Sequence, residues 1–369
     1  MKNDRIRVGI TQGDVNGIGY EVILKTFAVE EMMDLCTPIV YGSPKVATYH
    51  RKTLDLATTF SIINNASEAE NGKLSILACT SDEVRVEFGK EDHMTGKVAI
   101  ESLQRAVEDF KAGLIDVIVT APINKHTIHS EEFNFPGHTE FFEASLGNGQ
   151  KSLMILMNND IRIAVATGHL PLRDVSESLT SDLLKEKIAI FNNTLKEDFG
   201  STRPQIAILG LNPNAGDNGL LGKEEEEVIM PAIKDMFEEG IFCSGPFAAD
   251  GFFGARTYEK FDGVLAMYHD QGLTPFKLLA MDDGVNFTAG LPIVRTSPAH
   301  GTAYDIAGKG TAEEASFRQA IYHAIDIFRI RQAEDEAHAN PLRKQYFNRN
   351  DDSDKLDLQS DQEFSEKDY

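Results

Sequence analysis

The chain has 369 residues, of which 41% are hydrophobic and 25% charged, so we expect a packed protein with more than one core. Its net charge of −22 argues against nucleic acid and membrane surfaces as partners, because both are anionic and would repel it. No secretory signal, membrane span or C-x-x-C pair is evident, so we expect a cytoplasmic protein without disulfides or a cysteine metal site.

Short apolar runs predict buried strands at 5–11, 38–41, 116–120, 161–166, 205–209 and 263–267. A glycine-rich turn at 12–19 follows the first run, and a helix is predicted from an N-cap at Thr95 to a stop at Gly113. Strands that alternate with helices predict an α/β fold with a largely parallel sheet. In such folds the chemistry lies in loops after the strands, here 120–125, 168–169, 212–216 and 269–272.

Two histidines begin such loops. His169 follows the run at 161–166, and His269 follows the run at 263–267. Neutral imidazole is a common metal ligand, so the pair predicts a metal site with an open position. The alternative is two unrelated loop histidines.

Three cations are candidates for binding an anion. Lys125, Lys277 and Arg295 lie at or near the ends of apolar runs, among turn residues. Arginine can bind a phosphate or carboxylate through two hydrogen bonds, whereas lysine offers a compact charge. The alternative for each is an ordinary surface charge. The turn at 12–19 fits neither the dinucleotide fingerprint nor the P-loop, and a tight connection between strand and helix would explain it equally well.

The chain becomes polar from Glu334 onwards. Residues 350–369 carry eight acids against two lysines. We therefore expect 334–369 to form an acidic, mobile tail.

Several motifs together resemble the 4-hydroxythreonine-4-phosphate dehydrogenase family, over about residues 5–330. They lie at 17–19, 120–125, 136–140, 211–213, 268–272 and 275–277. Residues 299–310 are also similar to the coenzyme loop of isopropylmalate and isocitrate dehydrogenases. The resemblance implies a two-domain α/β/α architecture of the isopropylmalate dehydrogenase type. Residues 1–125 with 285–333 would form one domain, and 126–284 a second domain with the dimer interface.

The resemblance also implies a set of site residues. Those that bind the small phosphorylated substrate would be His138, Thr139, Lys277, Asn286 and Arg295. Those that bind NAD or NADP would be His300, Gly301, Thr302, Ala303 and Asp305. His169 and His269 would bind one divalent ion (zinc, magnesium, manganese or cobalt) shared between the subunits of a homodimer.

One position departs from the family pattern. Asn214 stands where the family has its third metal-binding histidine. An amide oxygen is a harder ligand than imidazole, so we expect weaker zinc binding and a shift towards magnesium or manganese. Asp270, next to His269, is a candidate proton acceptor, and a water molecule is the alternative.

The implied reaction is the NAD(P)-dependent oxidation of 4-phosphooxy-L-threonine at C3, followed by decarboxylation to 3-amino-2-oxopropyl phosphate, in pyridoxal 5′-phosphate (vitamin B6) biosynthesis. An alternative in the same family is a D-threonate or D-erythronate 4-phosphate dehydrogenase. Asn214 also permits a protein that binds a phosphorylated metabolite without turnover.

Overall fold

The computed structural model describes residues 5–81, 84–130 and 133–339. Its strands are β1 Arg7–Thr11, β2 Thr37–Gly42, β3 Ser61–Ile63, β4 Ser75–Ala78, β5 Val117–Thr120, β6 Leu153–Met157, β7 Arg162–Val165, β8 Ile206–Leu209, β9 Cys243–Phe247, β10 Gly263–Ala266, β11 Val285–Ala289 and β12 Arg295–Pro298. Each of the predicted strands is present, as β1, β2, β5, β7, β8 and β10.

The helices connect these strands in chain order. The α-helices are α1 Gly19–Thr26, α2 Met32–Leu35, α3 Pro44–Thr53, α4 His93–Lys111, α5 Lys125–Ile128, α6 His138–Leu146, α7 Leu172–Ser178, α8 Ser181–Glu197, α9 Met230–Glu238, α10 Ala249–Gly254, α11 His269–Ala280 and α12 Ala315–Ala339. Shorter turns are η1 Ala66–Glu68, η2 Pro213–Gly216, η3 Glu225–Ile229 and η4 Thr257–Lys260.

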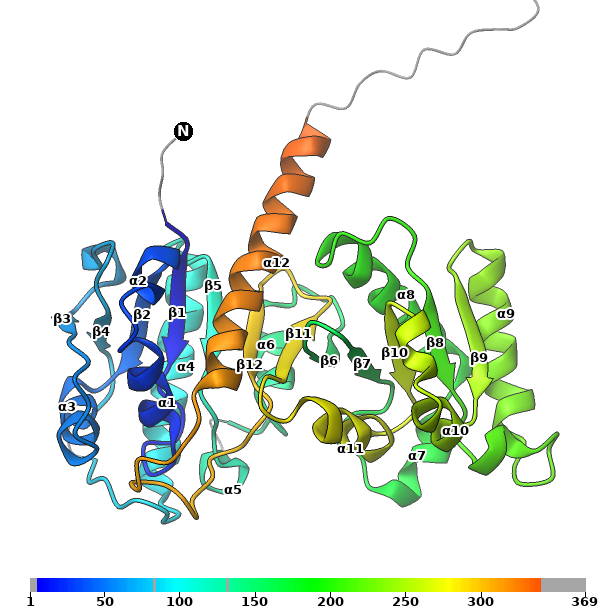
Figure 1. Ribbon diagram of the computed structural model, residues 1–369, viewed down its shortest axis with the longest axis horizontal. Helices are drawn as coiled ribbons and strands as arrows, with labels where there is room; N and C mark the ends of the chain where they lie inside the picture. Colours follow the sequence, from blue (N-terminus) through cyan, green and yellow to red (C-terminus); the bar gives the residue numbers. More distant parts are fainter. Residues whose placement is uncertain (1–4, 82–83, 131–132, 340–369) are drawn as a thin grey trace, which may run out of the picture.

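All of the strands belong to one sheet, with the order β3-β4-β2-β1-β5-β12-β11-β6-β7-β10-β8-β9. Pairing is antiparallel between β12 and β11, between β11 and β6, and between β6 and β7, and the other pairs are parallel. The predicted α/β fold with a largely parallel sheet is therefore confirmed. Figure 1 shows α5, α7 and α11, which follow β5, β7 and β10, along the lower side of the molecule.

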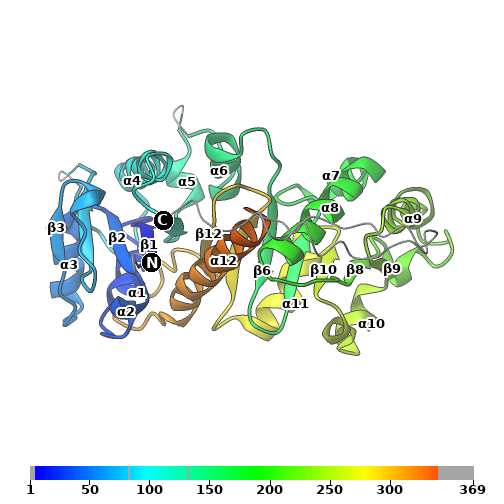
Figure 2. The same ribbon diagram turned by 90° about the horizontal axis from the view of Figure 1, so that it is seen from above.

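Helices cover both faces of the sheet. Figure 2 shows α4 and α6 on one side of the first strands and α1 on the other. Strands covered on both faces are shielded from solvent, and every residue of β2, β5, β6, β8 and β10 is buried.

The predicted N-cap of the long helix is wrong by three residues. The cap of α4 is Asp92, whose carboxylate accepts a hydrogen bond from the backbone N–H of Met94. Thr95 lies inside the first turn, where its buried hydroxyl contacts Asp14. The predicted stop is confirmed, because Gly113 follows the helix with a positive φ of 68° that favours glycine.

The remaining structural predictions concern the chain's organisation. The helix α12 continues to Ala339, so residues 334–339 of the predicted tail are helical, and 340–369 lie outside the described residues. The division into two domains stays a prediction. None of the helices in the described ranges has the length and apolarity that crossing a bilayer requires.

Candidate active site

A cavity of about 190 Å³ lies where the loops after β5, β7 and β10 meet the antiparallel strands and the start of α6. Nine of the predicted site residues line it: His138, Thr139, His169, His269, Lys277, Asn286, Arg295, His300 and Gly301. Lys125, a candidate anion-binding residue, lines it too. The cavity therefore unites the predicted substrate-binding residues, the two predicted metal ligands and the start of the predicted coenzyme loop.

The antiparallel strands form one wall of this cavity. Because side chains alternate along a strand, directly paired residues share a face of the sheet. Asn286 pairs with Leu156 of β6 and with Ser297 of β12, and all three line the cavity. In the next row Thr288 pairs with Met154 and Arg295.

Arg295 is a buried cation, only 1% exposed. Its guanidinium donates hydrogen bonds to the hydroxyls of Thr288 and Thr120, and its Nε has no partner. Burial lowers its pKa to about 9, although the charge of Glu140 raises it. A buried cation with unused donors is costly unless an anion completes it, so this geometry favours an anionic ligand.

The first turn of α6 contributes His138 and Thr139. Its backbone N–H groups lack partners within the helix, which makes such a turn suited to an anion. The hydroxyl of Thr139 lies 3.5 Å from that of Thr288, which in turn holds Arg295. Burial, followed by the charges of Arg295 and Lys125, holds the pKa of His138 well below its ordinary value. His138 is therefore a neutral hydrogen-bonding group, and its buried Nε2 has no partner.

His169 and His269 face one another across the cavity, with ring centroids 5.3 Å apart. Each ring has its Nδ1 directed at a carboxylate. Oδ1 of Asp270 lies 2.7 Å from Nδ1 of His269, and Oε1 of Glu140 lies 3.6 Å from Nδ1 of His169. A carboxylate at Nδ1 favours the tautomer that carries its proton there and leaves a lone pair on Nε2, the arrangement common in metal-binding histidines.

The surroundings of Glu140 favour its charged form. Burial raises its pKa, but its contact with His169, its backbone contact and the charges of His169 and Lys125 together lower it below the ordinary value. Oε2 of Glu140 is buried without a partner. The sequence had given this residue no role, although it belongs to the motif at 136–140.

Asp270 and Asn214 do not line the cavity. The side chain of Asp270 is 81% exposed and contacts His269 instead. Asn214 is exposed in η2 with a left-handed backbone at φ 54°, which asparagine tolerates better than most residues. Its loop is held by Glu225, which accepts hydrogen bonds from the backbone of Leu211 and Asn212. Within one chain, Asn214 is therefore not part of the cavity that the two histidines line.

The predicted coenzyme loop lies partly outside the cavity. Thr302, Ala303 and Asp305 do not line it. The carbonyl of Thr302 accepts a hydrogen bond from the backbone N–H of Ile18, in the glycine-rich turn. In that turn Gly17 lies so close to Thr302 that a Cβ would come within 2.8 Å of this carbonyl oxygen. Glycine is therefore required there for the two loops to meet.

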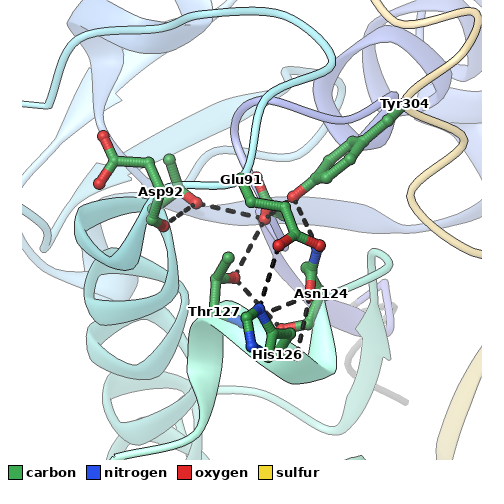
Figure 3. A network of polar contacts seen from close by, with 8 residues as sticks. Glu91, Asp92, Asn124, His126, Thr127 and Tyr304 are labelled. Atoms are coloured by element: carbon green, nitrogen blue, oxygen red, sulfur yellow. Dashed lines mark hydrogen bonds and ion pairs between the residues drawn. The ribbon is translucent and has the colours of Figure 1, made fainter.

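A polar network anchors this loop to the segment that carries Lys125 (Figure 3). The hydroxyl of Tyr304 donates to buried Asp14 at 2.6 Å and accepts from the side-chain amide of Asn124 at 3.1 Å. Burial raises the pKa of Asp14, and its hydrogen bonds partly offset that effect. Asn124 also caps α5 by accepting from the backbone N–H groups of His126 and Thr127. The backbone of Lys125 is thereby fixed between two loops.

Sequence reasoning missed the cavity residues Glu140, Met154, Leu156 and Ser297. The last three come from strands that the apolar pattern did not single out as part of a site. Alternation along β6 could have placed Met154 and Leu156 on one face, but only the pairing with β11 shows which face lines the cavity.

The family model described as pyridoxal phosphate biosynthetic protein PdxA matches residues 34–324. The chain belongs to this family. A PdxA relative from Bacteroides thetaiotaomicron, named 4-hydroxythreonine-4-phosphate dehydrogenase, is 65% identical over 97% of this chain and 98% of its own length. A relative from Oceanobacillus iheyensis, which carries D-threonate 4-phosphate dehydrogenase in its name, is 37% identical over 87% of this chain and 97% of its own.

Solved structures of the PdxA family agree with the fold. A 4-hydroxythreonine-4-phosphate dehydrogenase from Klebsiella pneumoniae matches with a TM-score of 0.76 at 32% identity, over 88% of this chain and 99% of that one. The family resemblance of the sequence motifs is thus confirmed.

Proposed function

We propose that this protein is an NAD(P)-dependent dehydrogenase that oxidises 4-phosphooxy-L-threonine at C3 and decarboxylates the product to 3-amino-2-oxopropyl phosphate. The observation that carries the proposal is a single cavity that holds a buried, incompletely bonded Arg295 beside two imidazoles oriented by carboxylates. The 65% identical relative of that name supports the same reaction. The composition favours the cytoplasm as its location.

The anionic ends of the substrate fit the cationic side of the cavity. Arg295, Lys277 and the first turn of α6 offer donors for phosphate and carboxylate oxygens, and Asn286 adds an amide. Contacts at both ends of a small substrate fix its orientation, so that C3 is held in one position. Met154 and Leu156, 8% and 3% exposed, form an apolar wall that limits water around the carboxylate to be lost.

His169 and His269 fit the role of metal ligands. Each has a carboxylate at Nδ1, and each lines the cavity. The described residues contain no group of three or more His, Cys, Asp or Glu side chains suited to a metal, so one chain supplies only part of a site. A bound divalent cation would act as a Lewis acid on the substrate hydroxyl and on the carbonyl formed from it. Asp270 orients His269 in this scheme, and water is left as the proton acceptor.

The coenzyme would lie along the loop that begins at His300 and Gly301. NAD or NADP supplies the hydride acceptor when bound. The network of Tyr304, Asp14 and Asn124 holds this loop against α5 and therefore sets its distance from the substrate.

We infer a homodimer that completes the site. Three large leucines in the segments that follow the predicted metal residues are exposed: Leu172 (72%) after His169, Leu220 (76%) after Asn214, and Leu278 (83%) on α11, which begins at His269. Exposed apolar side chains mark an association surface where they form a contiguous patch. A second copy placed there would bring its own Asn214 towards the histidine pair.

A turnover assay with the purified protein tests the proposed dehydrogenase reaction. Purified protein with 4-phosphooxy-L-threonine, NAD or NADP and a panel of divalent metals should form reduced coenzyme and CO2 in equal amounts. The measurement is the absorbance of the reduced nicotinamide with a parallel CO2 assay. Absence of reduced coenzyme with every metal would replace this proposal with a protein that binds the metabolite without turnover.

Replacing Asn214 tests the shared site. Asn214→His should tighten zinc binding by about tenfold or more, because imidazole is the better zinc ligand. The measurement is zinc affinity by competition with a chromophoric chelator, with Asn218→His, in the same exposed loop, as the control. Equal affinities in the two variants would place residue 214 away from the metal.

A further inference from the structure

Lys125 contacts the nitrogen of His169 that the proposed metal requires. Its Nζ lies 3.1 Å from Nε2 of His169. A lysine ammonium has donors and no lone pair, so Nε2 must be the acceptor. This agrees with the other side of the ring, where Glu140 faces Nδ1. The Nδ1–H of His169 therefore faces the carboxylate of Glu140, and the lone pair on its Nε2 faces the ammonium of Lys125.

An imidazole nitrogen has a single lone pair in the plane of its ring. A metal ion binds the same deprotonated nitrogen through that lone pair. The ammonium of Lys125 and a metal ion cannot use Nε2 of His169 together, and their like charges would also repel each other at this distance. Occupation by one requires departure of the other.

We propose that Lys125 is an exchangeable cation that occupies the metal position of His169 in the metal-free protein and moves to the substrate's anionic groups when metal binds. The inference rests on the proposed function for the identity of the metal site. It assigns Lys125 a task beyond a fixed substrate contact: one side chain links metal binding to anion binding.

The surroundings of Lys125 suit such a movement. Its backbone is fixed at the start of α5 by the cap from Asn124 (Figure 3), so the exchange involves only the flexible side chain. Its Cε lies 3.8 Å from the position that a Cβ on Gly137 would take, next to His138 and Thr139. Its charge already contributes to the lowered pKa of His138. A short swing therefore takes the ammonium from His169 to the anion-binding turn of α6.

The exchange makes the two binding events mutually favourable. Metal that displaces Lys125 adds a cation to the anion site, and an anion that attracts Lys125 frees Nε2 for the metal. By linkage, metal must tighten anion binding by the same factor by which the anion tightens metal binding.

Manganese affinity without substrate or coenzyme tests the exchange. We expect Lys125→Met to bind Mn²⁺ about tenfold more tightly than the wild type. The hydrogen bond from Lys125 to Nε2 of His169 is lost, so the metal no longer has to displace it. Lys277→Met is the matched control, because it removes a positive charge from the same cavity without a contact to His169. Free Mn²⁺ is counted by electron paramagnetic resonance in full-length protein.

Two further measurements complete the test. Lys125→Arg, which keeps a donor cation, should retain the wild-type Mn²⁺ affinity. Inorganic phosphate should tighten Mn²⁺ binding less in Lys125→Met than in the wild type. Equal Mn²⁺ affinities in Lys125→Met and Lys277→Met, or no Mn²⁺ binding in any protein, would overturn the inference. If the wild type shows no turnover but Lys125→Met binds Mn²⁺ more tightly, the proposed reaction is refuted and the exchange is supported.

Discussion

Arg295→Met should abolish nearly all activity while leaving the free protein folded and at least as stable. The wild-type guanidinium is buried without a hydrogen-bonded carboxylate, so the free protein bears the cost of a buried charge. The bound substrate would recover that cost through charge-assisted hydrogen bonds of about 1.5–3 kcal/mol each. Losing two of them lowers kcat/KM between about a hundredfold and ten-thousandfold.

Steady-state kinetics and thermal unfolding measure the two effects. Phosphate should raise the unfolding temperature of the wild type, because a ligand that binds only the folded state stabilises it, and should do so far less in Arg295→Met. Arg295→Lys keeps the charge but not the paired donors, and we expect it to lie between the two. A variant with kcat/KM within threefold of the wild type, or with a full phosphate response, would show that Arg295 does not bind the substrate.

His169→Ala and His269→Ala should each remove tight metal binding and lower kcat by a thousandfold or more, since each removes one of the two imidazoles that a single chain supplies. Glu140→Gln retains both rings and loses only the charge that faces Nδ1 of His169, so its metal affinity should fall about 10–100-fold. Metal content after gel filtration and kcat with added metal are the measurements.

His129→Ala is the control for the two histidine variants, because His129 is exposed and does not line the cavity. It should retain wild-type metal content and activity. Full metal binding in either His169→Ala or His269→Ala would remove that residue from the site.

The sequence allowed the prediction of those elements that strong local patterns specify. Buried parallel strands are continuously apolar, which is why β5, β7 and β10 were found, and with them the loops that carry Lys125, His169 and His269. The fold class followed from the alternation of strands and helices. The long helix was found by its apolar spacing, but its cap was misplaced, because Thr95 and Asp92 are both good cap residues. Only the structure shows that Asp92 accepts the capping hydrogen bond from Met94, while Thr95 contacts Asp14.

Local patterns predicted only Arg295 from the antiparallel part of the site. Strands β11 and β12 contain Asn286, Thr288 and Arg295, polar residues that interrupt the apolar signal, and Asn286 and Arg295 line the cavity. The role of Asn286 came from motif resemblance alone, whereas Arg295 was also a candidate anion-binding residue because it lies near an apolar run. The contact between Lys125 and His169 joins residues 44 positions apart and depends on how two loops converge, which neither composition nor spacing encodes. The role of Asn214 stays a prediction, since its proposed contact with the metal involves a second chain.

The preference between an amino and a hydroxy substrate tests the proposed reaction. Initial rates of reduced-coenzyme formation should be compared for 4-phosphooxy-L-threonine and D-threonate 4-phosphate, at the same metal and coenzyme concentrations. We expect a kcat/KM at least tenfold higher for 4-phosphooxy-L-threonine, with one CO2 released for each coenzyme reduced. A higher kcat/KM for D-threonate 4-phosphate would contradict it.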